Sequence, residues 1–243
     1  MATTALSNPE HVAARDGWRG VLVELGFVAA ALAVNQLVRW YTRDDLDVAL
    51  ANARDVLALQ QELHLDWEVA AQDLATSVPG LSTVAAHIYV WAYLPVVLGT
   101  MLWLYAFHRP HYRQLRTGLL ASGAVGALGY AFYPCAPPRL AGLGYADTVA
   151  DTSALEAVAR PFIANEIAAI PSFHVAWLLL AVLALASTIT VRWVRWLLLS
   201  LPVVMSFAIL TTGNHWVLDI PAGLLVFLVG LVAGRRLSPV RPS

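Results

Sequence analysis

Residues 216–232 read WVLDIPAGLLVFLVGLV, an apolar run that follows directly on His215 and carries one aspartate near its start. A run of this length and composition is typical of a helix that crosses a lipid bilayer. An ionisable residue inside such a helix is costly unless it has a partner, so Asp219 predicts one. His215 is the nearest, because residues four apart on a helix share a face.

The composition of the whole chain agrees with a membrane protein. It has 243 residues, of which 59% are hydrophobic and 13% charged, and its mean hydropathy is +0.65. This apolar share is above that of a soluble globular domain. The net charge of −1 gives no indication of nucleic-acid binding. Cys135 is the only cysteine, which excludes an internal disulfide, and the lack of lysine excludes Schiff-base chemistry.

Six apolar segments are long enough to be membrane spans, which predicts an all-α bundle of six transmembrane helices. In the third segment, Gly123, Gly126 and Gly129 form a stripe of small residues that would let another helix approach closely. The six segments cover residues 21–40, 81–107, 118–133, 174–190, 193–212 and 216–232.

The arginines predict the orientation of this bundle, because short cytoplasmic loops collect basic residues. They lie before the first segment, after the sixth, and in the links from the second to the third and from the fourth to the fifth. These arginines are Arg15, Arg19, Arg109, Arg113, Arg116, Arg192, Arg195, Arg235, Arg236 and Arg241. Acidic residues dominate the other loops, among them Asp44, Asp55, Glu62, Asp66, Asp147, Asp151, Glu156 and Glu166.

We therefore expect a membrane domain at 21–234 in the plasma membrane, with cytoplasmic segments at 1–20 and 235–243. Between the first two spans, residues 44–78 carry apolar positions at near-helical spacing among charges. This pattern predicts amphipathic helices at the outer membrane interface. They could be a lid that only packs over the bundle, or an element through which substrate enters.

Three polar residues converge on the outer face in this topology. His174 and His215 lie at the starts of the fourth and sixth segments, and Arg139 follows the end of the third. A carboxylate bonded to one ring nitrogen of His215 would orient the ring and leave the other nitrogen to attack. Either histidine could instead be an interfacial residue with a satisfied hydrogen bond, and the His215–Asp219 pair could be purely structural.

The residues around His174 and Arg139 suit an anionic substrate. Pro171 is placed to start a helix, whose free N–H groups and dipole favour an anion, and the Ser172 hydroxyl adds a donor. His174 could protonate a leaving oxygen. Arg139 follows two prolines that stiffen the chain, and its guanidinium could hold phosphate in a bidentate manner, or it could reach toward lipid headgroups.

These motifs resemble the type-2 phosphatidic acid phosphatase (PAP2) superfamily, and within it the branch similar to inositol phosphorylceramide synthases. Residues 165–174 (NEIAAIPSFH) resemble the second motif of that branch, 212–219 (TGNHWVLD) the third, and 136–139 (APPR) the first. Weaker resemblance at 87–89 and 102–105 extends it over most of the chain after about residue 45.

The resemblance implies a membrane enzyme that acts on lipid phosphates, as a phosphatase or a phosphotransferase. By this resemblance His215 attacks phosphorus to form a phosphohistidine, Asp219 supports it, and His174 protonates the leaving group. Water, or an alcohol or polyol acceptor such as inositol, then releases the phosphoryl group, and no metal or other cofactor is required. We expect Arg139, Ser172 and Asn214 to bind the phosphate and His87 to lie behind the site.

Two departures from the wider superfamily favour the inositol phosphorylceramide synthase-like branch. The Ser-Arg pair six and seven positions before the nucleophile is replaced by Ala208 and Ile209. Arg109-Pro110 imitates the end of the superfamily's first motif, but Leu102 stands where its lysine would be.

Two other classes of function are alternatives. The first is haem or metal binding through histidines, which is disfavoured because His108 and His111 are predicted on the opposite side of the membrane from the site. The second is a transporter or an inactive lipid-binding protein, which is disfavoured because all three catalytic side chains are present.

Overall fold

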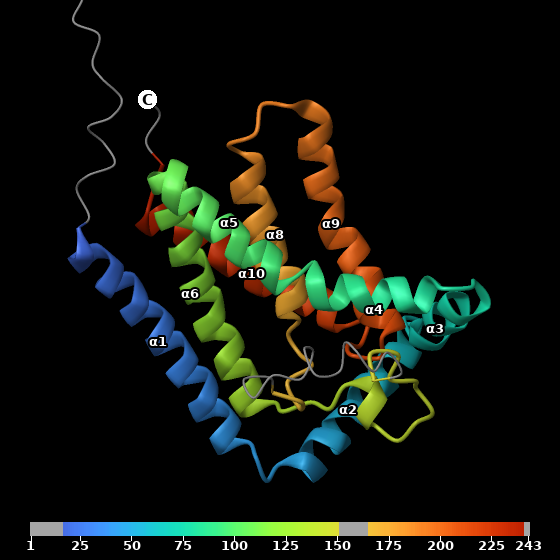
Figure 1. The fold of residues 1–243 in the computed structure, drawn as a ribbon. Coiled ribbons are helices and arrows are strands. Elements are labelled where there is room, and N and C mark those ends of the chain that lie inside the picture. The colour runs from blue at the N-terminus through green and yellow to red at the C-terminus, as the bar shows by residue number, and fades with distance from the viewer. Residues whose placement is uncertain (1–16, 151–164, 241–243) are drawn as a thin grey trace, which may run out of the picture.

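The computed structural model describes residues 17–150 and 165–240, and most of these are helical (Figure 1). The helices are α1 (Trp18–Tyr41), α2 (Leu46–Glu62), α3 (Glu68–Ser77), α4 (Leu81–Trp91), α5 (Leu94–Phe107), α6 (Arg109–Phe132), η2 (Pro138–Leu140), α8 (Phe173–Ala186), α9 (Arg192–Thr211) and α10 (Asp219–Leu237). The all-α prediction is confirmed for this part of the chain. The predictions for residues 1–16, Arg15, Asp151, Glu156 and Arg241 concern residues outside it.

Four stretches are long and apolar enough to cross a membrane. They are α1, the pair α4 and α5 taken together, α9 and α10. The third predicted segment forms part of α6, which begins with arginine-rich turns. The fourth forms α8, whose 14 residues make a helix about 21 Å long, shorter than a hydrocarbon core of about 30 Å. The structure therefore supports a membrane protein with four candidate spans.

The predicted span 81–107 is divided into two helices. α4 ends at Trp91 and α5 begins at Leu94, with Pro95 in its first turn. Proline lacks a backbone N–H, and its ring would clash with the carbonyl four residues earlier, so a continuous helix breaks here. The break places Tyr93 between the two helices, where its ring can turn toward the site.

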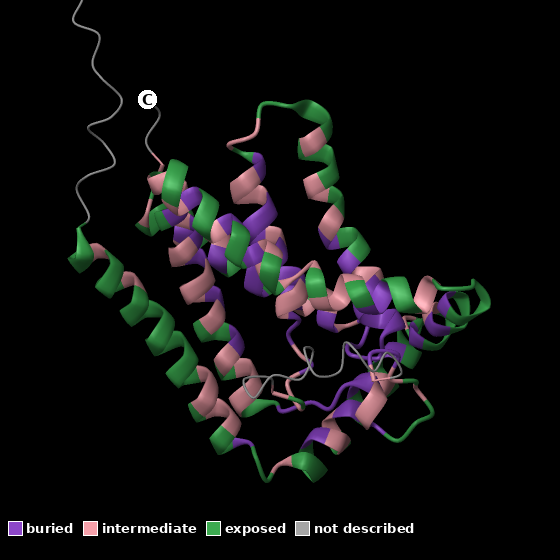
Figure 2. Cartoon of the chain, in the orientation of Figure 1, coloured by how far each residue is buried: buried purple, intermediate pink, exposed green. Residues whose placement is uncertain are grey.

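α1 lies along the outside of the bundle and is exposed over most of its length (Figure 2). Its large apolar side chains face outward, as expected for a lipid-facing span. Glu24 anchors it to α6: its carboxylate accepts a hydrogen bond from the Tyr112 hydroxyl at 2.6 Å and forms an ion pair with Arg116. The acid inside this span is therefore paired, as its cost requires.

Glycines allow α6, α8 and α10 to pack closely. A Cβ on Gly118 of α6 would lie 2.9 Å from the carbonyl oxygen of Gly230 in α10. A Cβ on Gly126 would lie 2.3 Å from the ring of Phe173, the first residue of α8. The close approach predicted for the glycine stripe is confirmed, and it fixes the start of α8 against α6.

The connections between helices fall into two groups at opposite ends of the bundle. The starts of α1 and α6, the α8–α9 link and the end of α10 lie toward one end (Figure 1). The α1–α2 link, η2 and the segment that precedes α8 lie at the other. The first motif, at 136–139, and most of the second, at 165–172, therefore lie at this second end.

α2 and α3 cover that second end. Ala49, Ala53, Val56 and Gln60 are the buried residues of α2, at the spacing of one helix face. The three apolar ones pack in one cluster with Cys135, Ala136 and Trp216. α2 therefore has one buried face, which rests on segments that carry the motifs, while the position of α2 and α3 at the outer membrane interface stays a prediction.

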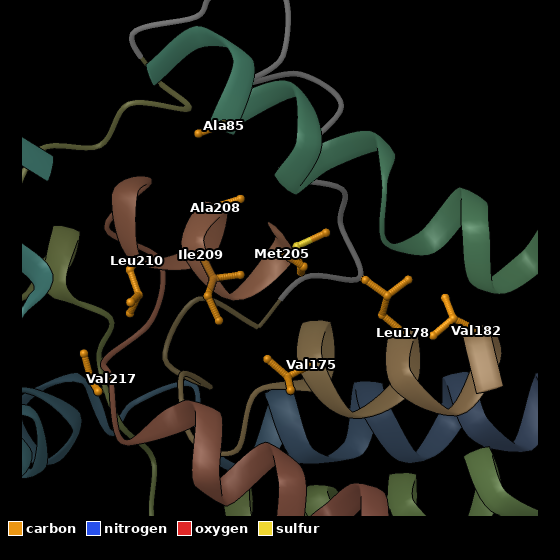
Figure 3. Packing of buried hydrophobic residues seen from close by; sticks show 9 residues of the cluster. All are labelled: Ala85, Val175, Leu178, Val182, Met205, Ala208, Ile209, Leu210 and Val217. Carbon is orange, nitrogen blue, oxygen red and sulfur yellow. The ribbon is translucent and has the colours of Figure 1, made fainter. Parts of the chain in front are cut away.

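A second apolar cluster joins α4, α8, α9 and the turn before α10. Its buried members are Ala85, Val175, Leu178, Val182, Met205, Ala208, Ile209, Leu210 and Val217 (Figure 3). Ala208 and Ile209 are fully buried in it. The two positions that carry Ser and Arg in the wider resemblance therefore serve here as core.

Candidate active site

His215 and Asp219 form the pair that the sequence predicts, but not on one helix. α9 ends at Thr211 and Asp219 is the first residue of α10, so His215 lies in the turn between them. The expected shared helix face is therefore wrong. The turn is held differently: Asp219 Oδ2 lies 2.8 Å from His215 Nδ1 and accepts the backbone N–H of Trp216 at 2.9 Å.

The hydrogen-bond partners of His215 define which ring nitrogen carries its proton. Nδ1 lies 3.0 Å from the carbonyl oxygen of Ala169 as well as 2.8 Å from Asp219 Oδ2. Because a carbonyl oxygen can only accept, Nδ1 is the donor, and Nε2 of the neutral ring carries the lone pair. His215 is only 5% exposed, and Asp219 is fully buried.

His174 lies beside the second ring nitrogen of His215, Nε2. It is the second residue of α8, and its Nδ1 lies 3.2 Å from His215 Nε2. Two tyrosine rings hold the imidazole: Tyr89 stacks on it with ring centroids 4.5 Å apart, and Tyr93 lies at 4.2 Å. The His174 side chain therefore has its position fixed by α4, the α4–α5 break and α8 together.

Hydrogen bonds join the segments that carry the three motifs. Cys135 forms an isolated parallel bridge with Ala168, and its N–H donates to the Ile167 carbonyl at 2.8 Å. The indole N–H of Trp216 donates to the Ala136 carbonyl at 2.9 Å. Cys135 itself is fully buried, and burial raises the pKa of its thiol.

Arg139 is bound to the turn that precedes His215. Its backbone N–H donates to the Gly213 carbonyl at 2.9 Å, and its Nε donates to Asn214 Oδ1 at 2.8 Å. Its Nη1 lies 3.8 Å from a carboxylate oxygen of Asp147. Glycine is needed at position 213, because its φ is +67° and a Cβ there would lie 2.4 Å from the Ala146 carbonyl oxygen.

A family model for the PAP2 superfamily matches residues 54–233, which is more than half of the chain. The chain belongs to the PAP2 superfamily. No curated protein and no solved structure matched it. The matched range includes both histidines, Asp219 and Arg139, and it begins within α2.

The other predicted site residues of this PAP2 chain differ in their surroundings. Ser172 occupies the N-cap position of α8 and is fully buried, but its Oγ makes no capping hydrogen bond and has no partner among the described residues. Asn214 has its Oδ1 on Arg139 and donates through Nδ2 to the Thr212 carbonyl at 3.1 Å. His87 is exposed on α4, and its Nδ1 donates to the Thr83 carbonyl of the same helix at 2.8 Å.

Sequence reasoning missed four residues of this PAP2 site. Tyr89 and Tyr93 had no separate role assigned, although Pro95 signals the break that places Tyr93. Gln60 and Glu68, on α2 and α3, contact the turn between His215 and α10. Their only signal in the sequence is that they are polar residues on the buried side of amphipathic helices.

Proposed function

We propose that this PAP2 protein is a membrane-embedded lipid-phosphate phosphatase or phosphotransferase that works through a phosphohistidine on His215. The observation that carries the proposal is the state of the His215 ring. Asp219 and the Ala169 carbonyl hold the proton on Nδ1, which leaves the Nε2 lone pair directed to His174. A nucleophile needs this arrangement of an orienting carboxylate and a free lone pair.

The proposed reaction has two steps. In the first, the His215 Nε2 lone pair attacks phosphorus, the ester P–O bond breaks, and His174 donates its proton to the leaving oxygen. In the second, water or an alcohol gives its proton to His174 and attacks phosphorus, and the P–N bond breaks to regenerate His215. The incoming phosphoryl group takes the place of the 3.2 Å contact between the two rings.

Arg139 supplies the positive charge for the phosphate in this proposal. It is anchored through Nε and its backbone, and an arginine held in this way can orient phosphate oxygens without losing further freedom. We propose that Asn214 orients Arg139, since both of its polar groups already have protein partners. The start of α8 at Ser172 would add backbone N–H donors.

Transfer of a phosphoinositol or other polyol-phosphate head group is the second candidate. Ala208 and Ile209 lie fully buried in an apolar cluster, and Leu102 is 71% exposed on the surface of α5. None of these positions can supply the basic groups that the wider superfamily carries there. The positive charge at the site is therefore smaller, which suits a phosphodiester better than a phosphomonoester.

A product survey tests the proposed function. Purified protein is incubated with phosphatidic acid, an isoprenyl diphosphate and a phosphoinositol lipid, each with and without inositol, and the products are identified by mass. We expect free phosphate or a new phosphate ester from at least one lipid. Phosphate release in both arms would assign a phosphatase, and an inositol ester would assign a transferase. If every lipid is returned unchanged, the proposed function is wrong.

We also propose that the site faces outward from the plasma membrane, with six crossings and both termini in the cytoplasm. α6 and α8 would then be the third and fourth crossings, and α2 and α3 would lie at the outer interface of the membrane. The support is the arginine distribution together with the grouping of the helix connections at two ends (Figure 1).

Two introduced cysteines test the orientation. Leu143 is 44% exposed in the segment after η2, and Ser187 is exposed after α8 at the opposite end. We expect a membrane-impermeant maleimide to label Leu143→Cys in intact cells and Ser187→Cys only after permeabilisation. The unsubstituted chain is the control, because Cys135 is buried and should not react. The reverse labelling pattern would show that the site faces the cytoplasm.

A further inference from the structure

Gln60 and Glu68 form a buried polar pair at the edge of the candidate site. Both side chains are fully buried, although α2 and α3 carry many exposed residues. Gln60 Nε2 donates to Glu68 Oε1 at 2.7 Å. Burial raises the pKa of Glu68, and hydrogen bonds from Val217 and Gln60 oppose this shift. A buried carboxyl has a desolvation cost, so its position calls for a physical explanation.

The pair binds the turn that links His215 to α10. Glu68 Oε1 accepts the backbone N–H of Val217 at 2.7 Å, and Gln60 Oε1 accepts the N–H of Leu218 at 2.9 Å. The N–H of the preceding residue, Trp216, donates to Asp219. Three successive amides in the turn just before α10 are therefore bound by side chains, one from Asp219 of α10 itself and two from α2 and α3.

These bonds resemble the capping of a helix start, but the caps come from distant parts of the chain. The first amides of a helix have no carbonyl partner within it, and a side-chain acceptor satisfies them. A carboxylate at this position is also favoured by the positive end of the helix dipole. Here Glu68 is 149 residues before Val217, and Gln60 is 158 before Leu218. The bonds thus link the α2–α3 segment to the backbone beside His215.

We propose that Gln60 and Glu68 are positioning residues for the nucleophile. Asp219 orients the His215 ring, and the Gln60–Glu68 pair fixes the backbone from which that ring projects. The α2–α3 segment is then part of the catalytic apparatus, beyond the lid and substrate-entry roles expected from the sequence. This inference rests on the proposed function, because it assigns a role in the attack by His215.

The position of the turn matters because attack needs narrow geometry. A displacement of about 1 Å at a reacting group can lower the rate roughly 100-fold, even when the change lies away from the chemistry. In the part of the chain that the structure describes, Glu68 and Gln60 bind the backbone of the turn and form no hydrogen bond with either histidine ring. Their loss should therefore lower kcat more than it raises KM.

Three variants test the proposal by activity. Glu68→Ala removes the acceptor for Val217, Glu68→Gln keeps an oxygen acceptor of the same reach, and Gln60→Met removes the acceptor for Leu218. Glu62→Ala is the control, since Glu62 is exposed on α2. We expect Glu68→Ala and Gln60→Met to lower kcat about 10-fold to 100-fold with KM changed less than about threefold. Glu68→Gln should retain most of the wild-type kcat.

Hydrogen exchange gives a second readout that does not depend on turnover. In Glu68→Ala the amides of 216–218 should exchange faster than in the wild type, and in Glu62→Ala they should not. If wild-type protein turns over lipid phosphates but Glu68→Ala and Gln60→Met keep the wild-type kcat, the proposal is overturned while the proposed function stands. A change confined to KM would also overturn it. If Glu68→Ala does not fold, Gln60→Met decides by the same criteria.

If the wild type turns over no lipid phosphate, the proposed function is contradicted, and kcat cannot test the role of Gln60 and Glu68. The exchange measurement then still reports whether Glu68 holds the turn. Unchanged exchange at 216–218 in both Glu68→Ala and Gln60→Met would show that the pair does not position this segment.

Discussion

Replacing His215 by alanine is expected to abolish turnover of lipid phosphates, with kcat lowered by about 10⁴-fold or more. Among the described residues of the site, no other side chain is placed to take over the attack, because Asp219 is fully buried and His174 is on the leaving-group side in the proposed reaction. The measurement is steady-state release of phosphate or ester from the substrate that the wild type turns over.

His215→Asn controls for folding in this experiment. Alanine would leave Asp219 buried without its side-chain donor, which can destabilise the protein, whereas the asparagine amide can still donate to Asp219. Thermal unfolding in detergent should show that His215→Asn is folded. His111→Ala, at the opposite end of the bundle in α6, should keep nearly all activity. Wild-type turnover in folded His215→Asn would show that His215 is not the nucleophile.

The second large effect is expected for His174→Ala, and it should depend on the leaving group. A general acid contributes roughly 10²-fold to 10⁴-fold when the leaving oxygen needs a proton. An alkyl lipid phosphate has such an oxygen, whereas the aryl oxide of an activated aryl phosphate can leave without a proton. The loss with the lipid should therefore exceed the loss with the aryl phosphate by at least about tenfold.

Tyr89→Leu and Tyr93→Leu serve as comparisons for this assignment. Both rings contact His174 but would take no part in proton transfer, so their loss should not create a dependence on the leaving group. Equal losses with alkyl and aryl substrates in His174→Ala would contradict the role of His174 as the acid. They would indicate instead that it only supports the His215 ring.

The sequence predicts which catalytic candidates meet better than it predicts the residues that hold them in place. His215 and Asp219 were found because a charged residue inside an apolar run needs a partner, and the structure pairs them at 2.8 Å. The helical geometry expected for the pair was wrong, because Asp219 caps the turn before α10 and does not share a helix with His215. Of the six spans predicted from the sequence, four correspond to stretches that are long and apolar enough in the structure, and α6 and α8 are not among these four.

The residues that hold the turn after His215 were missed because they act through contacts between distant segments. Gln60 and Glu68 bind the turn after His215, which lies about 150 residues later in the chain. A local sequence pattern does not reveal a contact between segments so far apart. Periodicity shows which face of an amphipathic helix is buried, but it does not show what that face contacts. Pro95 is different: it is a local signal for the break that places Tyr93, and a closer use of it would have predicted two helices at 81–107.

Trapping the covalent intermediate tests the account most directly. Wild-type protein and His174→Ala are mixed with phosphate-labelled substrate and quenched under alkaline conditions, which preserve phosphohistidine, and the labelled peptide is mapped by mass spectrometry. The account predicts a phosphoryl or phosphoester adduct on His215, more abundant in His174→Ala with an aryl phosphate and absent from His215→Asn. Turnover without an adduct, or an adduct on another residue that forms at the turnover rate, would contradict it.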